Sequence, residues 1–172
     1  MKNSPRFKTL NNWKIIVKFN CNFLDLQKER KLDLSVRANC HDGWIPYQGS
    51  CFLFSKDILN WFDAQSSCRA HNSRLAEVNS WAVNHFLESW AKIFGNSYFL
   101  GGRDDVTDGF WQWAYNSNYF TFTNWALGEP NNFNGQIENC LQLYTTGEWN
   151  DLNCNDKLHY ICEESSGLPI GK

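Results

Sequence analysis

Residues 128–154 have the sequence GEPNNFNGQIENCLQLYTTGEWNDLNC, in which acidic and amide side chains surround two cysteines. Three short groups carry these side chains: Gly-Glu-Pro-Asn-Asn at 128–132, Glu-Asn-Cys at 138–140 and Trp-Asn-Asp at 149–151. The stretch contains no histidine. Oxygen donors without imidazole favour a hard cation, and Ca²⁺ takes about six to eight oxygen ligands from carboxylates, amide and backbone carbonyls and water. The stretch therefore predicts a calcium site.

The candidate ligands in this stretch are Glu129, Asn131, Glu138, Asn150 and Asp151. Pro130 fixes its own φ angle and biases Glu129 towards an extended backbone, so Glu129 and Asn131 can face one ion across a sharp bend. Five side-chain donors leave coordination positions open. Neighbouring sugar hydroxyls can fill these positions while they also bond to the same carboxylates and amides. We expect the five residues to bind both the ion and a carbohydrate.

The chain resembles the C-type lectin domain, and the similarity extends well beyond these ligands. The family's opening hairpin is matched at 44–47 and 50–52, its first helix at 64–68, the segment after it at 75–78 and its closing pattern at 140–163. Residues 99–102 are Phe-Leu-Gly-Gly, where the family more often has Trp-Ile-Gly-Leu. The resemblance covers residues 40–164. It implies an α+β fold with two helices, short antiparallel strands and a long calcium-binding loop region, stabilised by disulfides.

The seven cysteines indicate disulfides plus one cysteine left over. Composition alone leaves the pairing open, because six cysteines allow many connectivities. The resemblance implies the pairs Cys40 with Cys51, Cys68 with Cys162, and Cys140 with Cys154. The last pair would staple together the two segments that carry the ligands. The remaining cysteine, Cys21, either forms an interchain disulfide that makes a homo-oligomer or stays unpaired.

The order Glu129-Pro130-Asn131 resembles that of mannose-type members of the family, whereas galactose-type members have Gln-Pro-Asp. Exchanging the acid and the amide exchanges acceptor and donor around the ion, so the accepted pair of hydroxyls should change as well. The resemblance implies calcium-dependent binding of mannose, glucose, N-acetylglucosamine or fucose, with glycans on microbes or cells as partners in innate defence. The competing interpretation is a non-sugar interaction or structural protein on the same fold, such as a receptor ectodomain, an ice-binding protein or a mineral-matrix protein.

A second, auxiliary calcium site is predicted at Asp104, Asp108, Asn132 and Glu138, where the family often holds another ion. Two positions that are commonly acidic are amides here, at Asn132 and Asn139. Because affinity follows the charge of the ligands, this site should be weaker or empty. The alternative is that the aspartates at 104, 105 and 108 belong to a solvated turn.

The ligand-bearing loop is one residue longer than the similar mannose-type loops. Phe-Asn-Gly-Gln-Ile lies between Asn132 and Glu138, so Glu138 could be displaced from the ion. Gly135 offers the flexibility to absorb an insertion. Phe133 either stacks on the apolar face of a sugar ring beside the ion or packs inward.

Residue patterns predict two helices and several strands. Asn60 can cap a helix that runs to about residue 70, with Asp63 in a capping-box-like position. Ser80 begins a second helix, in which residues 83, 86, 87, 90 and 94 recur at helical spacing and should form the buried stripe. Strands are expected at 98–101, 111–114, 139–143 and 159–163, with a polar loop over 116–136. The tryptophans at 44, 61, 81, 90, 111, 113, 125 and 149 should lie mostly in the core.

Charge separates the N-terminal region from the rest. Residues 1–39 carry nine Lys or Arg against three Asp or Glu, a formal charge of +6, whereas residues 40–172 carry seven against 15, a charge of −8. We interpret 1–39 as a basic extension that is either a clustering segment or an imperfect gene start, 40–164 as the lectin-like domain and 165–172 as a tail. The basic run at 28–31 is either a contact for a membrane surface or polyanion or, as is more common, a solvated tail. No nucleic-acid partner is expected.

The cysteines place the protein in an oxidising compartment, so it is expected to be secreted or extracellular. A clean signal peptide is not visible, because Lys14 and Lys18 interrupt the apolar stretch near the start. The chain has no run of about 18 apolar residues, so no membrane span is expected.

An enzymatic function is not expected. The histidines at 41, 71, 85 and 159 lie far apart without a nucleophile motif, and no His-x-x-x-His or Cys-x-x-Cys spacing occurs. Glu129 and Glu138 could pair as glycosidase carboxylates, but a bound ion would neutralise them and leave no acid with a raised pKa.

Overall fold

A computed structural model describes residues 40–165, and Cys21 with the proposed clustering segment lies outside them. The elements in chain order are β1 (Ile45–Tyr47), β2 (Ser50–Phe54), α2 (Trp61–Ala70), β3 (Arg74–Leu75), α3 (Trp81–Phe94), β4 (Tyr98–Arg103), β5 (Gln112–Trp113), the 3₁₀ helix η1 (Phe133–Gly135), β6 (Cys140–Leu143), β7 (Trp149–Leu152) and β8 (His159–Ser165). The predicted α+β class is confirmed. Among the described helices, none is long and apolar enough to cross a bilayer.

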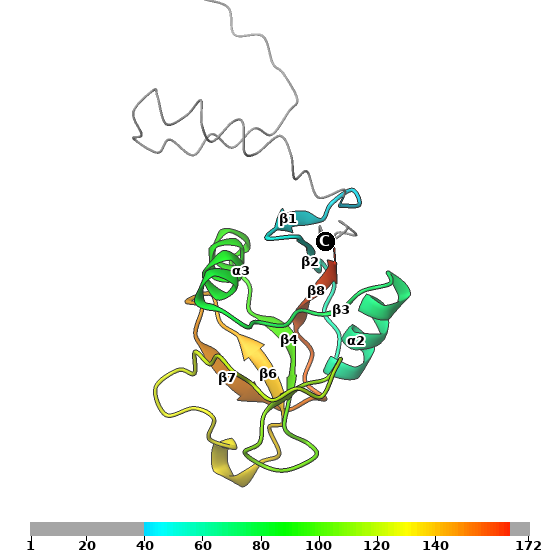
Figure 1. Ribbon diagram of the computed structural model, residues 1–172. Coiled ribbons are helices and arrows are strands. Elements are labelled where there is room, and N and C mark those ends of the chain that lie inside the picture. Colours follow the sequence, from blue (N-terminus) through cyan, green and yellow to red (C-terminus); the bar gives the residue numbers. More distant parts are fainter. Residues whose placement is uncertain (1–39, 166–172) are drawn as a thin grey trace, which may run out of the picture. The chain divides into compact units, whose positions relative to one another are not determined.

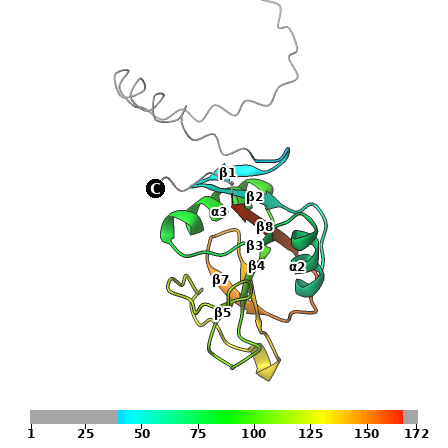
Figure 2. The same ribbon diagram turned by 45° about the vertical axis from the view of Figure 1, so that its right-hand side comes forward.

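The eight strands form a sheet in which the last strand is central (Figure 1). The strand order is β1-β2-β8-β4-β6-β7, with β3 paired to β8 and β5 paired to β4. β8 runs antiparallel to β2 and parallel to β4, so one strand pair departs from the antiparallel expectation. In both views α2 and α3 lie on opposite sides of the sheet, and the long loop region between β5 and β6 lies at the end remote from β1 (Figures 1 and 2).

Both helices begin at the predicted caps. Asn60 Oδ1 accepts a hydrogen bond from the Asp63 N–H at 2.9 Å, and Asn60 Nδ2 donates to Asp63 Oδ2 at 2.7 Å. Ser80 Oγ accepts from the Val83 N–H at 3.4 Å at the start of α3. These local bonds satisfy backbone donors that have no partner within the helix.

The buried face of α3 matches most of the predicted stripe. Leu87 is fully buried, and Val83, Phe86 and Trp90 are partly buried and pack against the core. The other fully buried residues are Asn84 and Ala91. Phe94, expected in the stripe, is 46% exposed, and Trp81, expected in the core, is 59% exposed. Asn84 is polar but fully buried. A pattern built from apolar residues alone could not identify it as part of the buried face. Trp81 lies in the first turn and stacks on exposed His85 with 6.4 Å between ring centroids.

Trp149, at the start of β7, joins α3 to the loop region. It is fully buried, and its Nε1 donates to Asn84 Oδ1 at 2.7 Å. Asn84 Nδ2 in turn donates to the Gly147 carbonyl at 2.9 Å, which fixes the turn before β7. The indole also contacts the rings of Trp113, Phe120, Phe122 and Trp125. One side chain therefore ties a helix, a turn and the long loop region together.

The three disulfides implied by the family resemblance are present. They join Cys40 to Cys51, Cys68 to Cys162, and Cys140 to Cys154. The second links α2 to β8, and the third links the start of β6 to the segment that follows β7.

Replacing Asn84 by alanine should destabilise the fold by about 1–3 kcal/mol, because the buried Trp149 N–H would lose its acceptor. Denaturant titration of the wild-type and variant proteins measures the free energy of unfolding. His85→Ala, one residue along the same helix and exposed, is the matched control and should change the value by less than about 0.5 kcal/mol. A loss in Asn84→Ala no larger than that of the control would contradict the assigned role.

Candidate functional site

Two segments hold the predicted ligands. The region before β6 carries Glu129, Asn131 and Glu138, and β7 carries Asn150 and Asp151. β6 and β7 pair as neighbouring antiparallel strands. The Cys140–Cys154 disulfide joins the start of β6 to the segment after β7, so it closes the end of the strand pair at which the loop enters β6. Two of the predicted ligands therefore lie on the sheet, and the other three lie in the loop region before β6.

Asp151 is the residue at which the loop meets the sheet. Its side chain is buried, and its carboxylate accepts the Asn131 N–H at 3.0 and 3.1 Å to its two oxygens and the Asn132 N–H at 2.8 Å. The Glu129–Pro130 peptide bond directly before these donors is cis. The two backbone donors directly after Pro130 therefore hold the loop against β7.

Glu129 lies against this carboxylate and carries a buried oxygen, Oε2, without a hydrogen-bond partner among the described residues. Burial raises the pKa of Glu129, contact with Asp151 and the charge of Glu138 raise it further, and a hydrogen bond with the Asn131 side chain lowers it. Carboxylates this close repel one another when ionised. A cation among them would remove the repulsion and provide a partner for the buried oxygen, so the donor set fits calcium.

The segment that was expected to be one residue longer than in similar loops forms a compact turn. η1 follows Asn132, whose φ is 45°, and includes Gly135 at φ 71°. Glu138 folds back on this turn, because its Oε2 accepts the Phe133 N–H at 2.6 Å and its N–H donates to Asn132 Oδ1 at 3.1 Å. Glu138 still lies near enough to Glu129 to raise its pKa. The Phe133 ring is exposed rather than packed inward.

The amide nitrogen of Asn150 is hydrogen bonded within the strand pair. Its Nδ2 donates to Gln142 Oε1 at 3.1 Å and also to the backbone carbonyl of Asp151. Since the nitrogen has these acceptors, Oδ1 is the atom able to bind a cation. Sequence analysis did not identify Gln142, which lies directly opposite Asn150 in the register of β6 and β7. A prediction of that strand pairing would have found it.

The predicted auxiliary residues form a second group beside Asp151. Asp104 is buried, its Oδ2 accepts the Gly109 N–H at 2.9 Å, and its Oδ1 has no partner among the described residues. Burial raises the pKa of Asp104, the Gly109 N–H lowers it, and the charges of Asp108 and Asp151 raise it. Asp108 Oδ1 accepts from Asn132 Nδ2 at 3.2 Å. The charge of Asp151 raises the pKa of Glu129 in the first group and that of Asp104 in the second, so Asp151 links the two groups electrostatically.

Two other acidic residues were considered for this second group. Glu138 contacts the group through Asn132, because the Glu138 N–H donates to Asn132 Oδ1 at 3.1 Å, and the charge of Glu138 also acts on Glu129. Asp105 accepts from Arg103 Nη1 at 3.2 Å in a partly exposed ion pair. The solvated-turn interpretation thus describes Asp105, but not the buried Asp104.

Tyr144 borders the site and was not identified from the sequence. Burial raises the pKa of Tyr144, and the charges of Glu129, Asp151 and Glu138 raise it further. A neutral phenol next to carboxylates can donate a hydrogen bond to them or to a ligand. Tyr144 directly follows β6, and nothing in its local sequence distinguishes it from an ordinary surface tyrosine.

The ligand chemistry depends on amides as well as acids. Within residues 40–165, no group of three or more His, Cys, Asp or Glu side chains is gathered closely enough to hold a metal ion alone. Both groups described above combine carboxylates with amide oxygens. Mixed oxygen shells of this kind are the ones that calcium accepts.

Comparison with known proteins gives a consistent match. The model of the Lectin C-type domain matches residues 57–164. A perlucin-like protein from Mytilus galloprovincialis is 36% identical over 133 residues, which cover 73% of this chain and 83% of that protein. Other curated relatives are longer, and the match covers from 9% to 58% of their length.

Two similar solved structures come from proteins with different functions, a carbohydrate-recognition domain and an antifreeze protein. The cow C-type carbohydrate-recognition domain of CD23, solved in the presence of a GlcNAc2Man3 oligosaccharide, has a TM-score of 0.68 and 30% identity, and the match covers 74% of this chain and 96% of that one. A Ca²⁺-dependent type II antifreeze protein in its Ca²⁺-free form has a TM-score of 0.66 and 28% identity, with coverage of 73% and 99%. This family and fold are those of non-enzymatic binding proteins. The chain belongs to the C-type lectin domain family.

Proposed function

We propose that this protein binds carbohydrates in a calcium-dependent manner with mannose-type specificity. The observation that carries the proposal is the crowded pair of Glu129 and Asp151, in which a buried carboxylate oxygen has no partner among the described residues. The ligands would be the five predicted from the sequence: Glu129, Asn131, Glu138, Asn150 and Asp151. When bound, calcium would supply open coordination positions for two neighbouring sugar hydroxyls.

The side chains around the ion would determine which sugar is accepted. The Glu129 carboxylate can accept a hydrogen bond from one hydroxyl, and the amide nitrogen of Asn131 can donate to the next. Asn131 is exposed, so a sugar can reach it. By resemblance, the acid-then-amide order favours equatorial 3- and 4-hydroxyls, as in mannose, glucose and N-acetylglucosamine, or another hydroxyl pair in fucose. The oligosaccharide used with the CD23 domain contains two of these sugars, which supports the proposal.

The wider biological proposal follows the same resemblance. Asp104, Asp108, Asn132 and Glu138 would hold a weaker auxiliary ion beside the first, and the charge of Asp151 acts on both groups. The protein would act outside the cell on glycans of microbial or cell surfaces, in innate defence. Residues 40–164 would form the binding domain, and the 1–39 extension with Cys21 would cluster several copies. Clustering would convert weak single-site contacts into useful avidity.

A non-sugar function is the second candidate, and the similarity to a Ca²⁺-dependent antifreeze protein favours it. On this alternative, the same calcium-stabilised loops would face ice, mineral or a protein. Calcium binding alone does not separate the two functions, whereas competition by free sugar does.

Retention on immobilised mannose tests the proposed function. The full chain should be retained in calcium and released by a chelator or by free mannose. The double variant Glu129→Gln, Asn131→Asp should shift retention from mannose to galactose, because donor and acceptor are exchanged. Glu148→Gln, an exposed substitution in the turn between β6 and β7, is the control and should behave as wild type. Absence of retention on both sugars, with calcium still bound by calorimetry, would favour the non-sugar candidate.

Calcium should stabilise the fold, by about 2.7 kcal/mol at about 100 times its Kd. Glu129→Gln should lose most of this gain, yet it should be more stable than wild type without calcium because one repelling charge is removed. Thermal and denaturant unfolding with and without calcium measure both effects, and Glu148→Gln is again the matched control. An undiminished calcium effect in Glu129→Gln would exclude this carboxylate as a ligand.

Without calcium, stability should fall as pH rises. The pKa values of Glu129 and Asp104 are raised, so the native state binds these protons more tightly than the unfolded chain, whose carboxyls titrate near about 4. This stabilisation is present at low pH and is lost as pH rises through the raised pKa values. Unfolding at about pH 5 and about pH 7 should show the slope, and Glu129→Gln with Asp104→Asn should reduce it. An equal slope in the double variant would contradict this assignment.

A further inference from the structure

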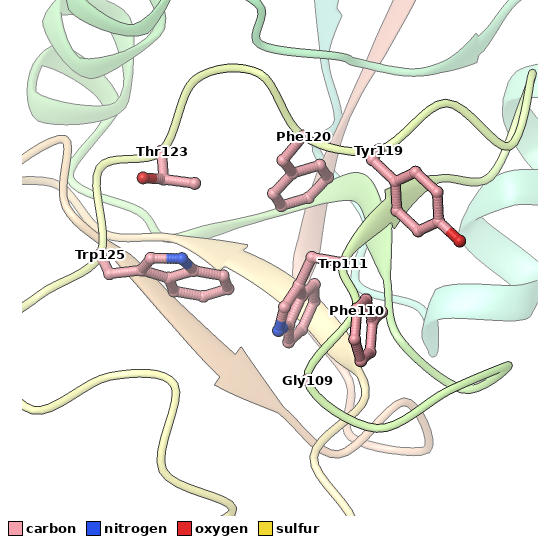
Figure 3. A pocket seen from close by; sticks show the side chains of 7 residues that line it. All are labelled: Gly109, Phe110, Trp111, Tyr119, Phe120, Thr123 and Trp125. Carbon is pink, nitrogen blue, oxygen red and sulfur yellow. The ribbon is translucent and has the colours of Figure 1, made fainter.

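Two of the pockets in the described part of the chain differ in the groups that line them. The pocket in Figure 3 is lined mainly by aromatic rings and carries no charged side chain. A second pocket, with a volume of about 240 Å³, is formed by α2, the last residue of β4 and the residue after β5, and we refer to it as the arginine pocket. It is lined mainly by Trp61, Phe62, Gln65, Arg69, Arg103 and Ala114. Two cations without an acid in the lining indicate a site for an anion.

One side of α2 supplies most of the arginine pocket. Phe62, Gln65 and Arg69 are spaced three and four residues apart, so they lie on the same side of the helix. Arg69 is in the last turn and exposed, and within residues 40–165 it forms no ion pair. Its charge is therefore available to a ligand.

Gln65 provides the second observation that points to a ligand. The side chain is only 5% exposed, and its Oε1 accepts the Leu75 N–H at 3.0 Å. This bond fixes the orientation of the amide, so Nε2 with its two N–H groups lies on the other side. Within the described region Nε2 donates no hydrogen bond, although buried polar groups are normally paired. Nε2 is also not one of the fully enclosed atoms that lack a partner there, so a ligand in the arginine pocket can reach it.

Arg103 supplies the second cation. Its guanidinium carbon lies 5.8 Å from the centroid of the Trp61 ring, which is held in place because Trp61 Nε1 donates to the Leu100 carbonyl at 2.8 Å. Asp105, outside the lining, accepts from Arg103 Nη1 at 3.2 Å. A guanidinium group has five N–H donors, so this contact leaves donors for a ligand. Two guanidinium charges against one nearby carboxylate leave the arginine pocket positive.

The arrangement of the donors indicates the kind of anion. Gln65, Arg69 and Arg103 present three separate donor groups. A carboxylate has only two oxygens, whereas a sulfate or phosphate monoester has three free ones, and arginine binds such oxygens in pairs. The volume is just below the range of about 300–1,000 Å³ for pockets of drug-sized ligands, so the pocket suits the anion and the atoms next to it.

We propose that the arginine pocket binds the terminal sulfate or phosphate group of a monoester, with Gln65 Nε2 and the guanidinium groups of Arg69 and Arg103 as its donors. The ring of Phe62, which is 49% exposed, contacts the organic part of the ester. The inference is independent of the proposed sugar function, because none of the lining residues is a predicted calcium ligand.

Titration of the full chain without calcium tests the arginine pocket. The readout is the pair of side-chain N–H resonances of Gln65 in a ¹⁵N spectrum, and the probes are phenyl sulfate, phenyl phosphate, inorganic sulfate and benzoate at constant ionic strength. At least one ester should shift the Gln65 pair with saturation and bind more tightly than inorganic sulfate or benzoate. The ester with the higher affinity distinguishes a sulfate from a phosphate ligand.

Three variants test the assigned roles. Arg69→Gln should weaken binding of the tighter ester about tenfold, because a charged donor group is lost. Lys92→Gln is the matched control, since it removes an exposed cation from the last turn of α3, outside the lining, and it should leave the affinity unchanged. Asp105→Asn should tighten binding about two- to fivefold, because it removes the carboxylate that competes for Arg103.

Several results would contradict the inference. Gln65 resonances that do not move, or equal weakening in Arg69→Gln and Lys92→Gln, would exclude a specific anion site in the arginine pocket. Benzoate bound as tightly as the esters would overturn the assignment of a tetrahedral group. Inorganic sulfate bound as tightly as the esters would overturn the assignment of a monoester.

The arginine pocket and the proposed sugar function can fail separately. Ester binding by a protein that mannose does not retain would reject the sugar function and keep the anion site. Mannose retention together with unmoved Gln65 resonances would do the reverse.

Discussion

The hydrogen bond from Trp149 to Asn84 is the constraint on which the functional end of the molecule depends. It fixes an indole inside the core at the first residue of β7, so the next two residues, Asn150 and Asp151, have defined positions. The same indole supports Trp125, four residues before Glu129. Core packing and the geometry of the candidate site are therefore linked. The buried Trp149 positions Asn150 and Asp151 in β7, and it also packs against Trp125 in the loop that leads to Glu129.

The loop that carries Glu129, Asn131 and Glu138 is organised by its backbone N–H groups, which donate to carboxylate and amide side chains. Asp151 accepts the N–H groups that follow Pro130, and Glu138 accepts that of Phe133, so acids that would bind an ion already shape the loop. Their proximity raises the pKa of Glu129. The protein thus brings carboxylates that repel one another to a loop held by backbone hydrogen bonds, and perturbed pKa values of this kind often cluster at functional sites.

Local features could be predicted from the sequence, whereas features set by strand placement could not. The cap at Asn60 involves neighbours three residues apart, and the disulfide pairs followed from family resemblance rather than from composition. Exposure of Trp81 depends on how α3 meets the sheet. The contact of Gln142 with Asn150 depends on strand register, and the position of Tyr144 beside the acids depends on the folded loop. The oxygen-bearing residues proposed as ligands were named from the sequence, but the hydrogen bonds of Asp151 to the Asn131 and Asn132 N–H groups depend on the folded loop.

The pairing of β2 with β8 brings the beginning and the end of the described region together, with Ser50 opposite Ser165. Both strands lie towards the end of the sheet away from the long loop region (Figures 1 and 2). A support attached at the end of the sheet where these strands lie would leave the long loop region free to face a partner surface. Several copies attached in this way would present their loops in the same direction. The avidity of such an array would increase with the surface density of the copies.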